Sequence, residues 1–199
     1  KWIVLLKKNI DELKEKLVLL SINIEEDKRY LQLLTFTLSS LYILDELDND
    51  PLESHVLPLI QKDLFQILKD KGAFQGKAQS GNFSMFYGIL LEHARLYINI
   101  DTDSVIKQWI NLHIKSMNKN GFWGDDKNMT YLQFQNGYHQ YEMLHYFNVG
   151  KKEAATAAKN VLLMGDKSGQ FAPYPGGGGC FDYDAVFILT IANSDSLKS

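Results

Sequence analysis

The chain has 199 residues, and its 24 acidic residues outnumber the 21 Lys and Arg residues, which gives a formal net charge of −3. With 45% hydrophobic and 23% charged residues, its composition is that of a globular domain, which excludes a disordered or fibrous chain. The sequence has no basic excess to neutralise phosphates, so we expect no nucleic-acid partner. Its single cysteine, Cys180, excludes an internal disulfide framework and every multi-cysteine zinc site.

We expect no transmembrane segment, because charged residues interrupt the apolar runs near the N-terminus before they approach the roughly 20 residues of a membrane span. The first twenty residues also lack the short apolar core and small-residue cleavage site of a secretory signal. The sequence therefore leaves the compartment open, with a slight preference for the cytoplasm.

Hydrophobic periodicity predicts a chain of helices. Apolar residues at three- and four-residue steps indicate an amphipathic helix over residues 2–20. A second helix, apolar on nearly every face and so expected to be buried, is predicted over residues 26–47, and a third over residues 54–71. Five more are expected over residues 83–98, 102–117, 131–147, 151–163 and 182–191. No segment alternates convincingly with period two, so the predicted fold class is all-α.

A glycine–aromatic turn recurs three times along the chain. Residues 69–74 (KDKGAF) return as residues 118–123 (NKNGFW) and again as residues 166–171 (DKSGQF). The glycines Gly72, Gly121 and Gly169 can each adopt the left-handed conformation that ends a helix, and an aromatic ring follows two residues later. The repeat unit is therefore an outer helix, this turn, a variable loop and a more apolar inner helix.

Four such helical hairpins can be assigned along the chain. They cover residues 1–50, as a degenerate copy without the glycine turn, and residues 54–98, 102–147 and 151–192. Repeated hairpins of this length form either a closed α/α toroid around a central cavity or an open solenoid. The long, unequal loops favour the toroid. Four hairpins are fewer than a closed toroid normally has, so residues 1–199 are interpreted as one all-α domain or as a fragment of a larger toroid with further repeats.

Three segments carry a resemblance to a known group. Residues 121–124 (GFWG), 166–171 (DKSGQF) and 176–185 (GGGGCFDYDA) resemble the Gly/aromatic repeats of the terpenoid cyclase and protein prenyltransferase superfamily. The resemblance covers about residues 63–192 and implies an α/α toroid with its active site in the central cavity. The chain has Asp182-Tyr183-Asp184-Ala185 where proton-donating cyclases have Asp-x-Asp-Asp. It also lacks the Asp-x-Cys order and distant His of the prenyltransferase zinc site. We therefore expect no metal and no cofactor.

Aligning the repeats on their glycines brings Asn82, Asn136 and Asp182 to equivalent positions at the starts of inner helices, which a toroid would gather on one rim. Each could be a structural N-cap, since Asn and Asp are preferred there. Histidine, tyrosine and carboxylate groups on an inner face can also move protons or bind a polar ligand. The candidate catalytic residues are His139, Tyr141, Asp182 and Asp184, and the candidate ligand-binding residues are Trp123, Asn136, Tyr174 and Tyr183.

Trp123 and Tyr174 enter the second set because they lie in predicted rim loops, where exposed rings stack on sugars or line apolar pockets. Asn136, His139 and Tyr141 loosely resemble the Asn, His and Tyr set of toroidal polysaccharide lyases. The alternative for all these polar groups is a satisfied hydrogen-bond network inside a helical core.

Three classes of function follow. The first is a ligand-binding toroid of the cyclase- or prenyltransferase-like kind. The second is a carbohydrate-active lyase or hydrolase, and the third is a non-catalytic scaffold for a protein or peptide. A site lined by Phe, Trp and Leu would indicate a hydrocarbon ligand, whereas clustered His, Tyr, Asp and Asn would indicate a small polar ligand such as a saccharide.

Overall fold

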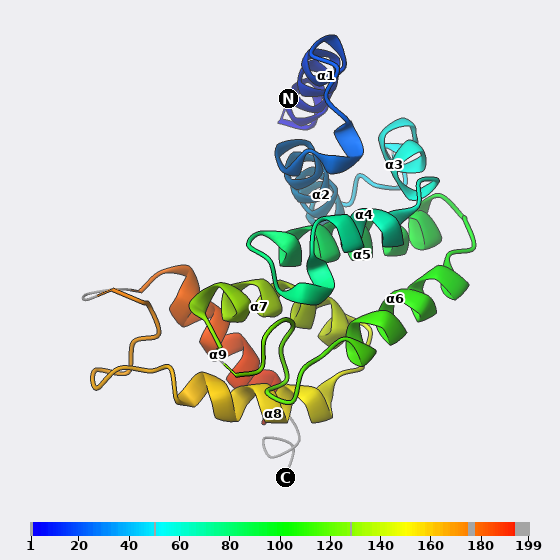
Figure 1. Ribbon diagram of the computed structural model, residues 1–199. Coiled ribbons are helices and arrows are strands. Elements are labelled where there is room, and N and C mark those ends of the chain that lie inside the picture. The colour runs from blue at the N-terminus through cyan, green and yellow to red at the C-terminus, as the bar shows by residue number, and fades with distance from the viewer. Residues whose placement is uncertain (1, 50, 128, 175–177, 194–199) are drawn as a thin grey trace. The chain divides into compact units, whose positions relative to one another are not determined.

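The computed structural model describes residues 2–49, 51–127, 129–174 and 178–193 of the chain. Within these ranges all regular secondary structure is helical, which confirms the all-α class (Figure 1). The α-helices are α1 (Trp2–Leu19), α2 (Lys28–Ile43), α3 (Glu53–Ile60), α4 (Leu64–Asp70), α5 (Ser80–Tyr97), α6 (Asp103–Lys115), α7 (Tyr131–Tyr146), α8 (Lys151–Leu162) and α9 (Cys180–Ala192). Two short 3₁₀ helices, η1 (Ile24–Glu26) and η2 (Ala73–Gln75), join them. None of the described helices combines the length and apolar character that a membrane span requires.

Side-chain caps explain where two helices differ from the predicted ranges. Helix α2 begins after Asp27, whose carboxylate accepts the N–H groups of Arg29 and Tyr30 at 3.0 and 3.1 Å. The single helix predicted over residues 54–71 is wrong, because the chain forms α3 and α4 with a break between them. Asp63 lies in that break and accepts the N–H of Gln66 at 3.0 Å, which starts a new helix.

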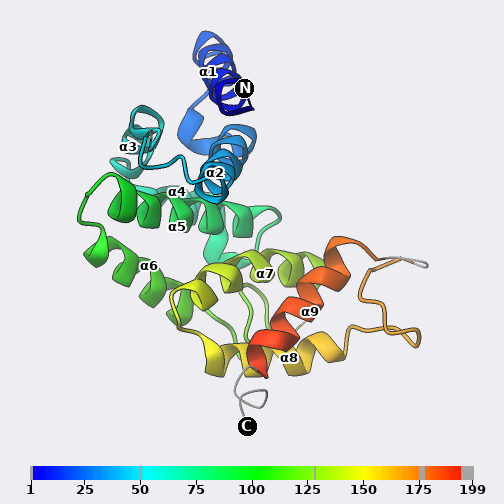
Figure 2. The same ribbon diagram turned by 180° about the vertical axis from the view of Figure 1, so that it is seen from behind.

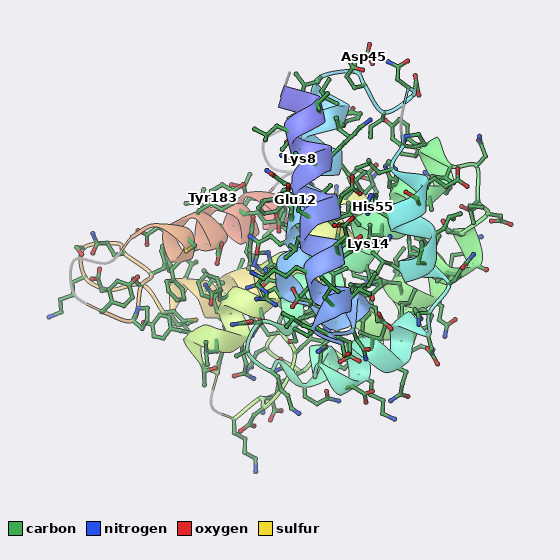
Figure 3. The ribbon with its side chains drawn as sticks, turned by 90° about the horizontal axis from the view of Figure 1, so that it is seen from above. Lys8, Glu12, Lys14, Asp45, His55 and Tyr183 are labelled. Carbon is green, nitrogen blue, oxygen red and sulfur yellow. The ribbon has the colours of Figure 1, made fainter. Side chains whose placement is uncertain are left out.

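The chain divides into two compact units. The first unit comprises the residues up to 67 together with residues 86–107, and contains α1, α2 and α3. Its core is formed by apolar side chains such as Ile10, Leu17, Leu31, Leu34, Leu38, Val56 and Leu90. A polar group, the His55 cluster (Asp11, Tyr30 and His55), joins three helices within it; Tyr30 and His55 are buried and Asp11 is exposed. The hydroxyl of Tyr30 lies 2.9 Å from Nδ1 of His55, and Nε2 of His55 lies 3.1 Å from Oδ1 of Asp11. Figure 3 shows His55 beside α1.

The second unit comprises residues 68–85 and the residues from 108 onward. Helices α8 and α9 pack against each other as a hairpin, and α9 also packs against α7 (Figure 2). The face that α8 buries consists of Ala154, Ala157, Ala158 and Val161, and its three alanines allow close packing. Large rings fill the core of this unit: Trp109, Phe122, Trp123, Phe134 and Tyr141 are all almost fully buried.

Two of the three repeated turns fold in the same way. Asn118 and Asp166 begin these turns, and their N–H groups donate to the carbonyls of Phe122 and Gln170 at 2.7 and 2.8 Å. Gly121 and Gly169 have φ angles of +79° and +80°, in the left-handed region that glycine accepts without strain. The copy at residues 69–74 shares the positive φ at its glycine but continues into η2. The repeat is therefore present in the backbone, and it is closest between the second and third copies.

Candidate functional site

Helix α7 carries most of the polar residues that the sequence singled out, and its start is well defined. The hydroxyl of Thr130 accepts the N–H of Gln133 at 3.2 Å, and the side chain of Gln133 accepts the N–H of Thr130 at 2.9 Å. This reciprocal capping box fixes the start of α7 at Tyr131. Asn136 is therefore the sixth residue of the helix, and the expectation that it caps an inner helix is wrong.

Asn136 instead joins two helices from inside the second unit. It is buried, its Oδ1 accepts the N–H of Gly81 at 3.3 Å, and its amide donates to the carbonyl of Leu132 at 2.7 Å. A Cβ at Gly81 would overlap the backbone of Asn136, so only glycine permits this approach between the start of α5 and the middle of α7. Both polar ends of Asn136 are used within the protein, which gives it a structural role.

Asn82 and Asp182 are also not caps, because each is the third residue of its helix. Oδ1 of Asp182 accepts the N–H of Phe171 at 2.7 Å, so this carboxylate holds the preceding loop against α9. Asn82 points toward α7, where its Nδ2 lies 2.9 Å from Nε2 of His139.

His139 lies at the centre of a chain of hydrogen bonds. Its Nδ1 lies 3.1 Å from Oε2 of Glu142, and the hydroxyl of Tyr138 donates to Oε1 of Glu142 at 2.6 Å. Because the amide of Asn82 donates to Nε2, the imidazole proton belongs on Nδ1, where it is donated to Glu142. The side chains of His139 and Glu142 are 22% and 29% exposed, so solvent or a ligand can reach both.

Aromatic rings border these polar groups. The ring of Tyr138 meets the rings of Tyr183 and Phe187 edge to face, with centroids 5.7 and 5.3 Å apart. Tyr183, on α9, is 61% exposed, so most of its ring is free for a ligand (Figure 3). Burial and the hydrogen bond to Glu142 both raise the pKa of Tyr138, so its phenol stays protonated and acts as a donor.

Asp184 is the most unusual group of the second unit. Its side chain is only 2% exposed, and Oδ2 has no hydrogen-bond partner among the described residues. Burial, and secondarily the charge of Glu142, raise the pKa of Asp184 to about 7. A carboxyl group that holds its proton near neutral pH is chemically poised to donate it. We define the α7 cluster as Asn82, Tyr138, His139, Glu142, Tyr183 and Asp184.

Two of the residues that the sequence nominated belong to the core. Trp123 is 1% exposed, and its Nε1–H donates to the carbonyl of His113 at 2.9 Å. Its expected place as an exposed ring on a rim is therefore wrong. Tyr141 is also fully buried, and its hydroxyl donates to the carbonyl of Gly121 at 2.6 Å, which ties α7 to the repeated turn. Neither ring is available to a ligand.

Tyr174 lies in the loop before α9, as predicted, and is 55% exposed. Its ring packs edge to face on Phe181, with centroids 6.4 Å apart, and no recorded contact joins it to the α7 cluster. The neighbouring residues 175–177, part of the glycine-rich run, lie outside the described residues.

Three members of the α7 cluster were absent from the nominated set: Asn82, Tyr138 and Glu142. The spacing of Tyr138, His139 and Glu142 carries a usable signal, because residues three and four apart lie on the same helix face. Asn82 lies 57 positions from His139, and only the fold brings these two residues together.

The described residues contain no group of three His, Cys, Asp or Glu side chains arranged to hold a metal ion. The side chains of the α7 cluster can form hydrogen bonds, stack on a ring and transfer protons. Comparison with known proteins adds no assignment: no family model, no curated protein and no solved structure matches this chain.

Proposed function

We propose that this protein binds a saccharide at the α7 cluster and acts on it by acid–base chemistry, within an architecture of the α/α-toroid type. The observation that carries the proposal is the bonded chain Asn82–His139–Glu142–Tyr138. Its amide, imidazole, carboxylate and phenol are the groups that exchange hydrogen bonds with sugar hydroxyls.

Accessibility supports a binding role. A polar network that only stabilises a core is closed to solvent, whereas His139 and Glu142 retain partial exposure. The exposed ring of Tyr183 lies beside them and supplies the flat apolar surface on which the C–H face of a sugar ring stacks. Hydrogen-bonding groups next to an aromatic platform thus occur together at one place.

One observation favours a second candidate, an isoprenoid ligand of the kind that the sequence resemblance implies. The rings of Tyr138, Tyr183 and Phe187 lie together near the buried Asp184, and an apolar chain could pack on them. The polar groups on α7 count against an isoprenoid. A hydrocarbon would displace water from these groups and would offer no hydrogen bonds in its place. The saccharide is therefore the better match.

Thermal unfolding with a ligand panel tests the proposal, since a ligand that binds only the folded state stabilises it by mass action. The panel contains neutral oligosaccharides, uronate oligosaccharides, and geranyl and farnesyl diphosphates. A ligand at about 100 times its Kd contributes about 2.7 kcal/mol, which raises Tm by roughly 5–10 °C in a chain of this size.

We expect a saccharide to raise Tm in the wild type, and Glu142→Gln and His139→Ala to lose that rise while they remain folded. Asp45→Asn, at an exposed position in the loop after α2, serves as the matched control and should keep the full shift. A shift produced only by the prenyl diphosphates would establish the second candidate. If no member of the panel shifts Tm, the ligand-binding proposal fails and a scaffold role takes its place.

A further inference from the structure

Two carboxyl groups of the α7 cluster stand in opposite surroundings. Glu142 receives hydrogen bonds from the hydroxyl of Tyr138 and from Nδ1 of His139. Asp184 receives none at Oδ2 from any described residue and is almost fully buried. An ionised carboxylate without donors or a cation in such a place is strongly disfavoured, so Asp184 keeps its proton. One carboxyl group is therefore arranged as an acceptor and the other as an acid.

The charged surroundings of Asp184 reinforce this division. Helix α9 packs against α7 and α8. From α7, Glu142 acts on Asp184 with its negative charge, and Tyr138 and His139 are the other titratable groups of the cluster on that helix. Helix α8 buries alanines, while its lysines are exposed. Thus the recorded influences on Asp184, burial and Glu142, both favour its neutral form.

We propose that Asp184 is the catalytic acid of a glycoside hydrolysis in which Glu142 is the base. This inference rests on the proposed saccharide ligand and assigns its reaction. The carboxyl proton of Asp184 passes to the glycosidic oxygen as the bond from that oxygen to the anomeric carbon breaks. A water molecule attacks the anomeric carbon and gives one proton to Glu142. Return of a proton from Glu142 to Asp184 through solvent restores both groups, so the balance is one glycoside and one water converted to a free sugar, which is a hemiacetal, and an alcohol.

Within this assignment the other members of the α7 cluster have positioning roles. Tyr138 and His139 orient the carboxylate of Glu142 from two sides, and Asn82 fixes the imidazole by occupying Nε2. Tyr183 presents an exposed ring beside Tyr138, on which a sugar ring can stack. Burial of Asp184 away from bulk water preserves its proton until a glycosidic oxygen arrives.

The first measurement needs no substrate. Carboxyl carbon NMR of the full chain, labelled at aspartate, follows each carboxyl group as the pH is varied. We expect one aspartate resonance to titrate near neutral pH, to be missing in Asp184→Asn and to be unchanged in Asp45→Asn. If Asp184 titrates with the ordinary exposed aspartates, it is not the acid and the inference is overturned.

The second measurement uses the phenyl and 2,4-dinitrophenyl glycosides of whichever sugar stabilises the protein in the thermal panel. Dinitrophenolate leaves without protonation, whereas phenolate needs the acid. Asp184→Asn should therefore lower the hydrolysis of the phenyl glycoside by about 100-fold or more and leave the dinitrophenyl glycoside within a few fold. A purely structural Asp184 would lower both rates together, which would overturn the inference while leaving sugar binding intact.

A separate variant protects the test against a folding defect in Asp184→Asn. Glu142→Ala removes the base, and added azide can attack the anomeric carbon in place of water. We expect azide to restore turnover of the dinitrophenyl glycoside in Glu142→Ala and to leave the wild-type rate unchanged. Failure of rescue in a folded variant that still binds the sugar rejects the assigned pair. If no saccharide binds at all, the proposed function fails first, and the hydrolysis fails with it.

Discussion

The two units of the chain each hold a cluster of a histidine, a tyrosine and an acidic residue, yet the two clusters differ in what they can do. In the His55 cluster, Tyr30 is fully buried and His55 is 6% exposed, so both are enclosed. In the α7 cluster, His139 and Glu142 keep partial exposure, and Asp184 is a buried carboxyl group whose Oδ2 has no hydrogen-bond partner among the described residues. The same residue types therefore bind helices together in one unit and remain available for chemistry in the other. The accessibility of the histidine, more than its residue type, separates the two clusters.

The largest expected effect concerns Trp123, which distinguishes the core of the second unit from its candidate site. Trp123→Ala should lower the free energy of unfolding by about 3–5 kcal/mol, because it removes a fully buried ring and the hydrogen bond to His113. Tyr174→Ala, at an exposed ring, should change it by no more than about 0.5 kcal/mol. Urea unfolding of both variants measures the difference. Equal effects would contradict the placement of Trp123 in the core.

The next effect tests the protonated state of Asp184. Its pKa is raised to about 7 from 3.8, so between these values the folded state holds a proton that the unfolded chain releases. The resulting stabilisation is complete below pH 3.8 and is lost as the pH rises through 7. Between about pH 4 and pH 8, the free energy of unfolding of the wild type should therefore fall by up to about 4 kcal/mol more than that of Asp184→Asn. Urea titrations at the two ends of this range measure it; parallel pH dependence in both proteins would refute the raised pKa.

A matched pair of histidine substitutions compares the two clusters directly. His55→Ala should lower the free energy of unfolding by about 2–3 kcal/mol, because it leaves the buried hydroxyl of Tyr30 without its recorded partner and creates a cavity. His139→Ala should lower it by less than about 1 kcal/mol, since water can replace a partly exposed imidazole. Thermal or urea unfolding decides. If His139 proves to be the more costly loss, the α7 cluster is itself a structural network.

The smallest effect concerns the aromatic platform. Tyr183→Ala should change stability by about 0.5 kcal/mol or less, because the ring is mostly exposed. It should weaken sugar binding by about 3- to 10-fold, which corresponds to the roughly 0.5–1.5 kcal/mol of an aromatic contact. Calorimetric titration with the stabilising sugar gives the affinity, and Tyr183→Phe, which keeps the ring, should retain it. Equal losses in the two variants would assign the effect to the hydroxyl.

The helices could largely be predicted from the sequence because their signals are local. Hydrophobic spacing located α1, α6, α7 and α8 to within one or two residues at each end. The prediction of one helix over residues 54–71 was wrong because Asp63 caps a new helix in the middle of the apolar pattern. Hydrophobic periodicity alone does not show such a break. The glycine turn was correctly identified as a repeat because left-handed backbone strongly selects glycine.

The candidate site was harder to predict because burial and long-range pairing decide it. Asp182 and Asp184 are both aspartates, so the sequence does not distinguish them. In the fold the side chain of Asp184 is buried, whereas Asp182 accepts a hydrogen bond from the preceding loop. Trp123 follows a glycine in a loop, a position where rings are often exposed, and here the loop folds back into the core. Asn82 reaches His139 only because Gly81 lets two backbones approach closely.

The alanines of α8 have a mechanical consequence for the candidate acid. Ala154, Ala157 and Ala158 lie on the buried face of α8, and the packing of α8 against α9 leaves little slack for α9 to roll about its axis or slide along its neighbour. A roll of one residue's arc, about 100°, would carry Asp184 toward the exposed setting that Tyr183 now has. The packing of α8 thus limits the rotation of α9 about its own axis. The solvation of the Asp184 carboxyl group depends on that rotation.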